Sequence, residues 1–447
     1  MTQADRPAPS DLARFFKSLA AVEPFELKAV ILSLLYFFFL FGSYSVVKPV
    51  RDAMGTVYGI DRIQELFTGT FFATLVLAPL YAGLASRLKL STFLPWVYGF
   101  VAVSILVFYA LFALGAEHDR WVAAAFYIWV SAFNMLIISV FWTFMADIFS
   151  RTQAKRLFGF IAAGGTVGGI AGPAVATFLA KLVGNGGLML ISAGGFVVTA
   201  FIVVSIAGEK ERLIAASGVE AQRTTLNHRL GSSNPFSGFL LLVRSPYLLL
   251  FALFLLLMTW ISTIVYIQLG DLITKAFPSR EARTQAYASI DLIVNSAAVL
   301  LQIFGTGRII SRFGVKTGLL LNPIIMVLAF LAIVFSPVLM VLAGMQIIRR
   351  VAEYAIAKPT REMLFTVVDQ ESKYKAKNVI DTVVYRGGDV TAAWIGTALL
   401  PFGITGLAIF GAIVSAVWFP IAYLLGKRYE SAKGEEGAAG QEPVRAH

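Results

Sequence analysis

Long apolar segments dominate this chain and leave it few ways to fold. About twelve of them reach the ~20 residues that a helix needs to cross the hydrocarbon core of a bilayer. They lie at about 29–50, 64–86, 92–114, 121–146, 157–182 and 187–207, and then at 246–275, 284–307, 317–336, 338–366, 379–400 and 404–426. Barrel strands would be shorter and would alternate in polarity. The sequence therefore predicts an all-α polytopic membrane protein, with about twelve transmembrane helices in two six-helix halves.

The amino-acid composition argues against several other classes of protein. Of the 447 residues, 58% are hydrophobic and only 14% are charged, which is too little polar surface for a soluble protein of this size. The net charge of +11 invites a nucleic-acid partner, but the basic residues fall mostly in alternate loops, as in membrane proteins. No cysteine is present, which excludes disulfides and thiolate metal sites. We therefore expect contact with membrane lipid and no nucleic-acid partner.

Basic residues also predict the orientation of the chain. With the N-terminus inside, 24 Lys and Arg residues fall in the proposed cytoplasmic segments and 6 fall on the opposite side. This asymmetry is typical of cytoplasmic loops. Residues 1–10 lack the apolar core of a cleavable signal peptide. The sequence predicts two cytoplasmic termini and a location in the bacterial inner membrane.

The apolar segments divide the chain into five expected parts. Polar stretches separate the two halves and flank them. The parts are a cytoplasmic segment with an interfacial helix near 11–26 (1–28), a first six-helix half (29–208), a cytoplasmic linker (209–245), a second half (246–426) and a disordered tail (427–447).

Two loops repeat at a constant spacing. Residues 147–165 read DIFSRTQAKRLFGFIAAGG and residues 369–387 read DQESKYKAKNVIDTVVYRG, at an offset of 222. Each joins the fourth span of its half to the fifth, which supports two related halves. We expect gating contacts in these loops and in those after the second and eighth spans, at Arg87, Asp147, Arg151, Arg312, Asp369 and Lys373.

Charged residues inside the apolar segments are the candidate functional residues, because such charges usually face a water-filled cavity. The first span ends in SYSVVKPVRDAMG, where Lys48 and Arg51 lie on one helical face next to Asp52. The alternative is that Lys48 extends to the outer interface. In the eighth span, Asp291 is a candidate proton site, a counter-ion for arginines of the tenth span, or a polar contact between helices.

The tenth span, MQIIRRVAEYAIAKPTRE, carries the most charge. Arg349 and Glu353 are four residues apart and are expected to pair, with Arg350 beside them. Guanidinium groups suit phosphate or carboxylate. The sequence predicts a cavity with an excess of bases, in which the substrate-binding residues are Lys48, Arg51, Arg349, Arg350 and Arg386. The expected counter-ions or proton carriers are Asp291, Glu353 and Asp389.

Two further motifs carry a resemblance to a known superfamily. The loop GRIISRFGVK, with Ser311, and the glycine run GGTVGGIAGP resemble the cytoplasmic and fifth-helix motifs of the major facilitator superfamily. That superfamily usually has Asp where Ser311 stands, and Ser86 takes the same place in the first half. Independently of the resemblance, a four-residue spacing predicts a smooth ridge for close helix packing at Gly164, Gly168 and Gly172.

The end of the first span, VVKPVRDAMG, resembles the bacterial and plastid ATP/ADP translocase (nucleotide exchanger) group. The resemblance implies that Lys48 and Arg51 contact a nucleotide. It leaves open other anionic solutes, such as an organic phosphate or a sugar-peptide.

These observations predict a secondary active transporter for a small anionic solute, working by alternating access. Nucleotide exchange is one form; a proton-coupled facilitator for another anionic or amphipathic solute is the alternative, and a non-transporting receptor or scaffold belongs to a different class. No phosphate-binding loop of the Gly-x-x-x-x-Gly-Lys type occurs, and three scattered histidines make no metal cluster. We expect no enzymatic activity, no cofactor, no metal and a monomeric protein.

Overall fold

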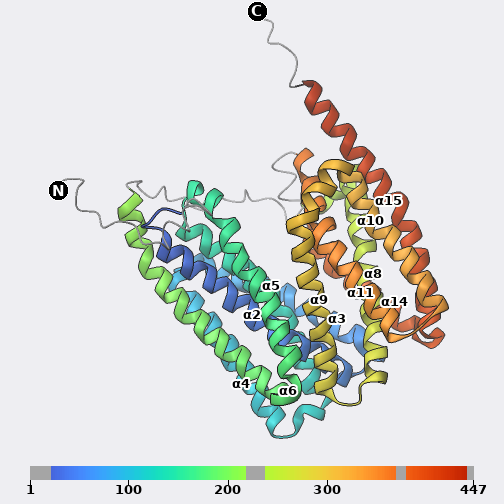
Figure 1. Cartoon of the computed structure of the whole chain (residues 1–447), viewed down its shortest axis with the longest axis horizontal. Helices are drawn as coiled ribbons and strands as arrows, with labels where there is room; N and C mark the ends of the chain where they lie inside the picture. Colours follow the sequence, from blue (N-terminus) through green and yellow to red (C-terminus); the bar gives the residue numbers. More distant parts are fainter. Residues whose placement is uncertain (1–21, 218–236, 369–378, 440–447) are drawn as a thin grey trace, which may run out of the picture. The chain divides into compact units, whose positions relative to one another are not determined.

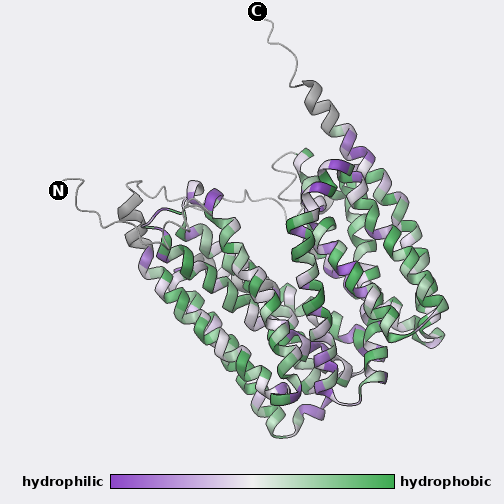
Figure 2. Ribbon diagram, in the orientation of Figure 1, coloured by the Kyte–Doolittle hydropathy of each residue, from purple (hydrophilic) through white to green (hydrophobic). Residues whose placement is uncertain are grey.

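The computed structural model describes residues 22–217, 237–368 and 379–439, and every regular element in these ranges is helical. Most of the interfacial helix predicted near 11–26, together with Asp369 and Lys373, lies outside the described residues. Figure 2 shows apolar residues along most of the length of the long helices. The chain is therefore an all-helical integral membrane protein.

The chain divides into two compact units, neither of which is one continuous piece. Unit 1 comprises Met1–Val57, Phe72–His228 and Ser279–Leu292, and unit 2 comprises Tyr58–Phe71, Arg229–Pro278 and Ile293–His447. Each unit thus takes in the first turns of a helix whose remainder belongs to the other unit.

The helices of the first part of the chain are α2 (Leu27–Tyr58), α3 (Ile63–Arg87), α4 (Leu90–Ala113), α5 (Arg120–Ile148) and α6 (Arg151–Ser217), with short 3-10 turns at Ile60–Arg62 and Ala116–His118. Within unit 1, α4 packs along α6 (Figure 1).

The later helices are α7 (Ser237–Arg244), α8 (Pro246–Ala276), α9 (Arg280–Leu301), α10 (Gly307–Phe335), α11 (Leu339–Ala352), α12 (Lys358–Met363), α14 (Tyr385–Leu399) and α15 (Gly403–Ala439). Short 3-10 turns lie at Leu364–Val367 and Leu400–Phe402, and π-helical turns lie at Gln302–Thr306, Glu353–Ala357 and Ile380–Val384. Within unit 2, α10 packs on α15, and α8 packs on α14 and α15 (Figure 1).

Among the described residues, seven helical stretches are long and apolar enough to cross a membrane. Three of them are much longer than one crossing requires: Thr152–Glu209, Arg280–Phe335 and Tyr385–Ala432. Each contains a glycine with positive φ, at Gly184, Gly314 or Gly403, a conformation that L side chains rarely adopt. Each glycine lies between two spans that the sequence predicts. The count of twelve stays a prediction.

The helix α15 extends beyond its predicted end. It runs to Ala439, through residues 427–439 for which the sequence predicted a disordered tail. The segment KRYESAKGEEGAA is rich in Ala, Glu and Lys, which favour helix and let the preceding helix propagate.

Helix α2 lies in the core of unit 1. Tyr36 contacts Tyr98 of α4 through a 2.5 Å hydroxyl pair, and Phe37 stacks on Phe141 of α5 with ring centroids 4.0 Å apart. Further along, Val47 and Val50 are fully buried. The apolar surface that holds α2 therefore continues to the level of its charged residues.

The glycine ridge of α6 packs against the backbone of α2. A Cβ atom on Gly168 would lie 2.5 Å from the carbonyl oxygen of Phe38, and one on Gly172 would lie 2.6 Å from that of Gly42. At Gly164 the obstacle is the backbone of Leu34. The absence of side chains at these positions is what allows the two helices to approach so closely.

A buried carboxylate, Glu26, fixes the start of α2 to the start of α6. It is 1% exposed and accepts hydrogen bonds from Arg156 (2.7 Å) and Gln153 (2.9 Å). Replacing Glu26 by alanine is expected to lower the free energy of unfolding by about 2 kcal/mol, because the buried Gln153 amide loses its charged acceptor and Arg156 loses its ion pair. Thermal unfolding of the purified protein measures this. The control is Lys28→Ala, since Lys28 is 64% exposed and an exposed pair contributes about 0–1 kcal/mol; equal losses would contradict the prediction.

Candidate functional site

The charged end of α2 forms a compact cluster in unit 1. Lys48, Arg51 and Asp52 lie at positions i, i+3 and i+4 on a helix that runs without interruption through Pro49. Asp52 is 3% exposed and accepts from both cations: Arg51 Nη2 lies 2.5 Å from Oδ1, and Lys48 Nζ lies 3.4 Å from Oδ2. One buried carboxylate therefore holds two cations.

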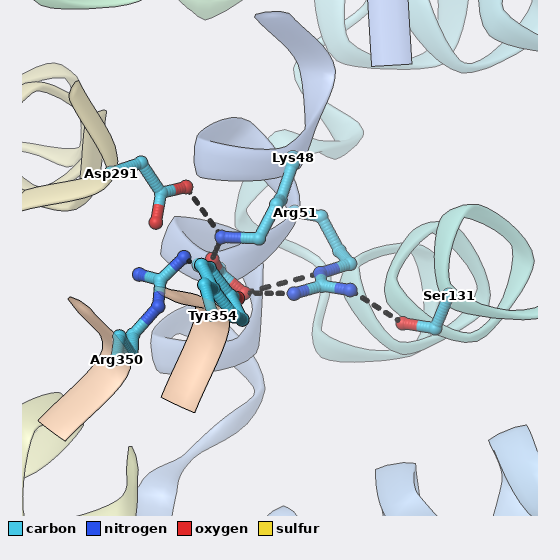
Figure 3. Close-up of polar contacts among 7 residues, drawn as sticks. Lys48, Arg51, Ser131, Asp291, Arg350 and Tyr354 are labelled. Carbon is cyan, nitrogen blue, oxygen red and sulfur yellow. Dashed lines mark hydrogen bonds and ion pairs between the residues drawn. The ribbon is translucent and has the colours of Figure 1, made fainter. Parts of the chain in front are cut away.

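The second carboxylate of this cluster comes from α9. Asp291 Oδ2 lies 2.5 Å from Lys48 Nζ, and its side chain is 5% exposed (Figure 3). The first turns of α9 belong to unit 1, where Thr284 also bonds to Asn185. Among the roles considered for Asp291, the structure shows it as a counter-ion, but for Lys48 of the first span.

The guanidinium of Arg51 is further held by α5. Its Nη1 donates to Ser131 Oγ at 3.3 Å (Figure 3). Its Cζ lies 5.1 Å from the centre of the Tyr127 ring. Sequence reasoning missed both residues because they are neutral. Their four-residue spacing, which places them on one face of α5, was the only available signal.

The cluster resolves how Lys48 and Arg51 are oriented. Their side chains are 23% and 13% exposed, and both end on carboxylates of unit 1. The Lys48 ammonium therefore points towards these carboxylates. Two cations and two carboxylates balance one another, so the cluster is close to neutral while keeping partly accessible cations.

The adjacent arginines of α11 have different environments in unit 2. Arg349 is buried, and its guanidinium bonds to Glu353 (2.8 Å) and Gln346 (3.0 Å) of its own helical face. Arg350 is partly exposed, and its Nη2 donates to the Tyr354 hydroxyl at 3.3 Å (Figure 3). The expected Arg349–Glu353 pair is thus present, and it makes Arg349 part of the packed interior of unit 2.

The helix α14 contributes a second charged pair to unit 2. Arg386 Nη1 lies 3.3 Å from Asp389 Oδ2, and Asp389 also accepts from Thr263 of α8 at 3.2 Å. Both charged side chains are partly exposed, at 20% and 13%. Because the pair is not fully buried, part of the Arg386 guanidinium remains accessible to solvent.

Among the described gating residues, Arg87, Asp147 and Arg151 lie at or near helix ends, and Arg312 lies inside α10. Asp147 is exposed near the end of α5, and Arg312 is exposed with its guanidinium 5.6 Å from the centre of the Phe313 ring. Arg87 ends α3 and Arg151 begins α6. Within the part of the chain that the structure describes, no group of three or more His, Cys, Asp or Glu side chains is placed to hold a metal ion.

Comparison with known proteins adds evidence of a different kind. The sequence model of a family described as "TLC ATP/ADP transporter" matches residues 115–341 and 329–426. The chain is 23% identical to ADP,ATP carrier protein 1 of Chlamydia pneumoniae, over 94% of this chain and 95% of that protein. It is 26% identical to ADP,ATP carrier protein 1 of Chlamydia muridarum, over 70% of this chain and 66% of that protein.

Solved structures with a similar fold are transporters. A bacterial homologue of the iron transporter ferroportin in an inward-facing state matches with a TM-score of 0.63 and 12% identity, over 89% of this chain and 99% of that one. A bacterial homologue of the human lysosomal transporter Spinster matches with a TM-score of 0.60 and 14% identity, over 92% and 99%. The fold is therefore similar to that of these transporters, and at these identities the likeness extends to the fold alone.

Proposed function

The chain belongs to the TLC ATP/ADP transporter family, and from this premise we propose that it exchanges nucleotides of the ATP and ADP type across the bacterial inner membrane by alternating access. The relatives from Chlamydia carry the name of ADP,ATP carriers. The residues that would recognise such a substrate must supply cations, because the phosphate chain is its most strongly charged part.

The cluster around Lys48 is the observation that supports this proposal most directly. Phosphate and carboxylate oxygens accept the same charge-assisted hydrogen bonds from ammonium and guanidinium groups. A phosphate can therefore replace the Asp291 or Asp52 oxygens on Lys48 and Arg51 without leaving either cation unpaired. An uncharged solute has no such means of displacing the carboxylates, which gives the site a preference for anions.

This arrangement also supports exchange, as opposed to one-way transport. The Lys48 ammonium is held by Asp291 of α9. A bound anion takes over the lysine and releases Asp291, so occupancy changes the contacts between α2 and α9. A ligand shifts a conformational equilibrium only through such differential contacts. We propose Asp291 as the counter-ion that couples occupancy to the conformational change.

Unit 2 offers its own cations for the phosphate chain. Arg350 and Arg386 are partly exposed, and we propose them as substrate contacts, with Asp389 as the counter-ion of Arg386. Arg349 is committed to Glu353 in the interior. We propose that this pair maintains the helix rather than binding substrate.

The arrangement in the membrane is part of the proposal. We propose twelve spans, with halves at 29–208 and 246–426 and both termini in the cytoplasm, supported by the distribution of basic residues between loops. A monomer is sufficient for this mechanism.

Counter-exchange in proteoliposomes tests the proposed function. Vesicles loaded with ADP are expected to accumulate external labelled ATP, and vesicles without internal nucleotide are expected to accumulate none. A pH gradient alone is expected to drive no uptake. Uptake into empty vesicles under a pH gradient would favour the proton-coupled alternative, and absence of nucleotide uptake in all cases would overturn the proposal.

A further inference from the structure

A row of three side chains lies on the charged helix of unit 2, and only Arg350 among them has a role in the account above. Tyr354 lies between two cations: the Arg350 Cζ is 5.5 Å from the centre of its ring, and the Lys358 Nζ is 4.4 Å from it. The three residues are spaced by four along the chain, and their contacts show that they share one face of the helix.

A π-helical turn brings these residues into line. Four residues of α-helix exceed a full turn by about 40° because one turn takes 3.6 residues. The wider turn at Glu353–Ala357 contains more residues per turn, so that a four-residue step falls short of a full turn. The two deviations offset each other, and Arg350, Tyr354 and Lys358 form a nearly straight row of about 12 Å.

Side chains from the neighbouring π-helical turn maintain this geometry. A π-helical turn leaves backbone carbonyls available for other donors. Gln302 donates to the carbonyl of Tyr354 at 3.0 Å, and Thr306 donates to that of Ala355 at 2.7 Å. Both donors belong to the π-helical turn Gln302–Thr306 between α9 and α10. The row is thus fixed by specific hydrogen bonds and not only by helix propensity.

Lys358 and Arg349 lie on the same charged segment but differ in their ion pairs. Lys358 is exposed and makes no ion pair with the carboxylates that the structure describes, while Arg349 on the same segment is buried on Glu353. Arg350 lies eleven residues after the start of α11, about 17 Å along the helix. In the span that the sequence predicts at 338–366, that position is near the middle of a ~30 Å hydrocarbon core. A charge at that depth is costly in lipid, so we infer that this face of the helix turns away from lipid.

We propose that Arg350, Tyr354 and Lys358 form a subsite for a polyanionic chain, in which Lys358 distinguishes long phosphate chains from short ones. The proposal rests on the proposed function for its substrate class. A triphosphate has enough charged oxygens to engage both cations of the row at once, whereas a single phosphate contacts only one. Tyr354 separates the cations and keeps them from collapsing onto a shared partner.

Binding of inorganic phosphates to the purified full-length protein tests the subsite. Isothermal titration with tripolyphosphate, pyrophosphate and phosphate is compared between the parent protein and Lys358→Gln. Affinity for tripolyphosphate is expected to fall about tenfold, as for loss of one charge-assisted hydrogen bond, and affinity for phosphate to change less than about twofold. Lys358→Arg is expected to retain most of the tripolyphosphate affinity.

Unit 2 provides a matched control in Lys316, whose Nζ lies 4.0 Å from the centre of the Tyr423 ring. Lys316→Gln removes the same charge from the same kind of contact and is expected to leave all three affinities unchanged. Equal losses for both variants, or a loss that does not depend on chain length, would overturn the subsite. The binding result and the transport assay test different proposals. Binding that depends on phosphate-chain length, without nucleotide exchange, would contradict only the proposed function. Nucleotide exchange, with binding that does not depend on chain length, would contradict only the subsite.

Discussion

Exchange of labelled ATP for internal ADP is expected to fall about 100-fold or more when Lys48 is replaced by glutamine. The substitution removes one of the two cations of the α2 cluster, and it takes from Asp291 the ammonium that lies 2.5 Å away. Losing one partner of a buried hydrogen-bonded charge pair costs about 2–5 kcal/mol, which corresponds to this range in rate or affinity. Initial rates in proteoliposomes measure the effect.

A double variant separates binding from folding. In Lys48→Gln with Asp291→Asn, two neutral side chains replace the ion pair, so thermal stability is expected to return towards that of the parent protein while exchange stays absent. Lys275→Gln is the control, because Lys275 is 67% exposed in a pair with Asp271 on α8. Recovery of exchange in the double variant would show that Lys48 has only a structural role.

The largest effect on stability is expected from Gly168→Val. The new side chain would begin 2.5 Å from the carbonyl oxygen of Phe38, and a backbone atom cannot move aside as a flexible side chain does. The helices α2 and α6 must separate, at a cost of about 3 kcal/mol or more. The yield of folded protein in detergent and its midpoint of thermal unfolding report the change.

The same helix supplies the control for this prediction. Gly159 also lies in α6, but a Cβ atom there would meet nothing within 4 Å. Gly159→Val is expected to change the midpoint of thermal unfolding little. Its effect measures the general cost of valine in this helix and is subtracted from the effect of Gly168→Val. Comparable loss in both variants would mean that close packing at Gly168 is not what stabilises unit 1.

Features set by local spacing were within reach of the sequence. A four-residue repeat of glycine places small residues on one helical face, and α6 presents that face to α2. The three- and four-residue spacing of Lys48, Arg51 and Asp52 likewise places them together on α2. Long apolar segments dictate helices because lipid offers no partner for backbone polar groups.

Features set by distant or neutral residues were not within reach. Asp291 joins Lys48 from 243 residues away, and hydropathy carries no record of that pairing. Ser131 and Tyr127 are neutral and unremarkable in an apolar helix. The adjacent arginines 349 and 350 looked equivalent, although neighbouring residues on a helix point about 100° apart and so enter different environments.

The discontinuous make-up of the two units has a consequence for biosynthesis. Unit 1 includes Ser279–Leu292, so it is not complete when the ribosome has finished its first 228 residues. Until Asp291 has been made, Lys48 lacks the carboxylate that lies 2.5 Å away, and Asp52, at 3.4 Å, is also bonded to Arg51. A polypeptide interrupted in the linker would therefore end before the Lys48–Asp291 pair can form. Unit 1 is completed only when the segment Ser279–Leu292, which carries Asp291, has been synthesised.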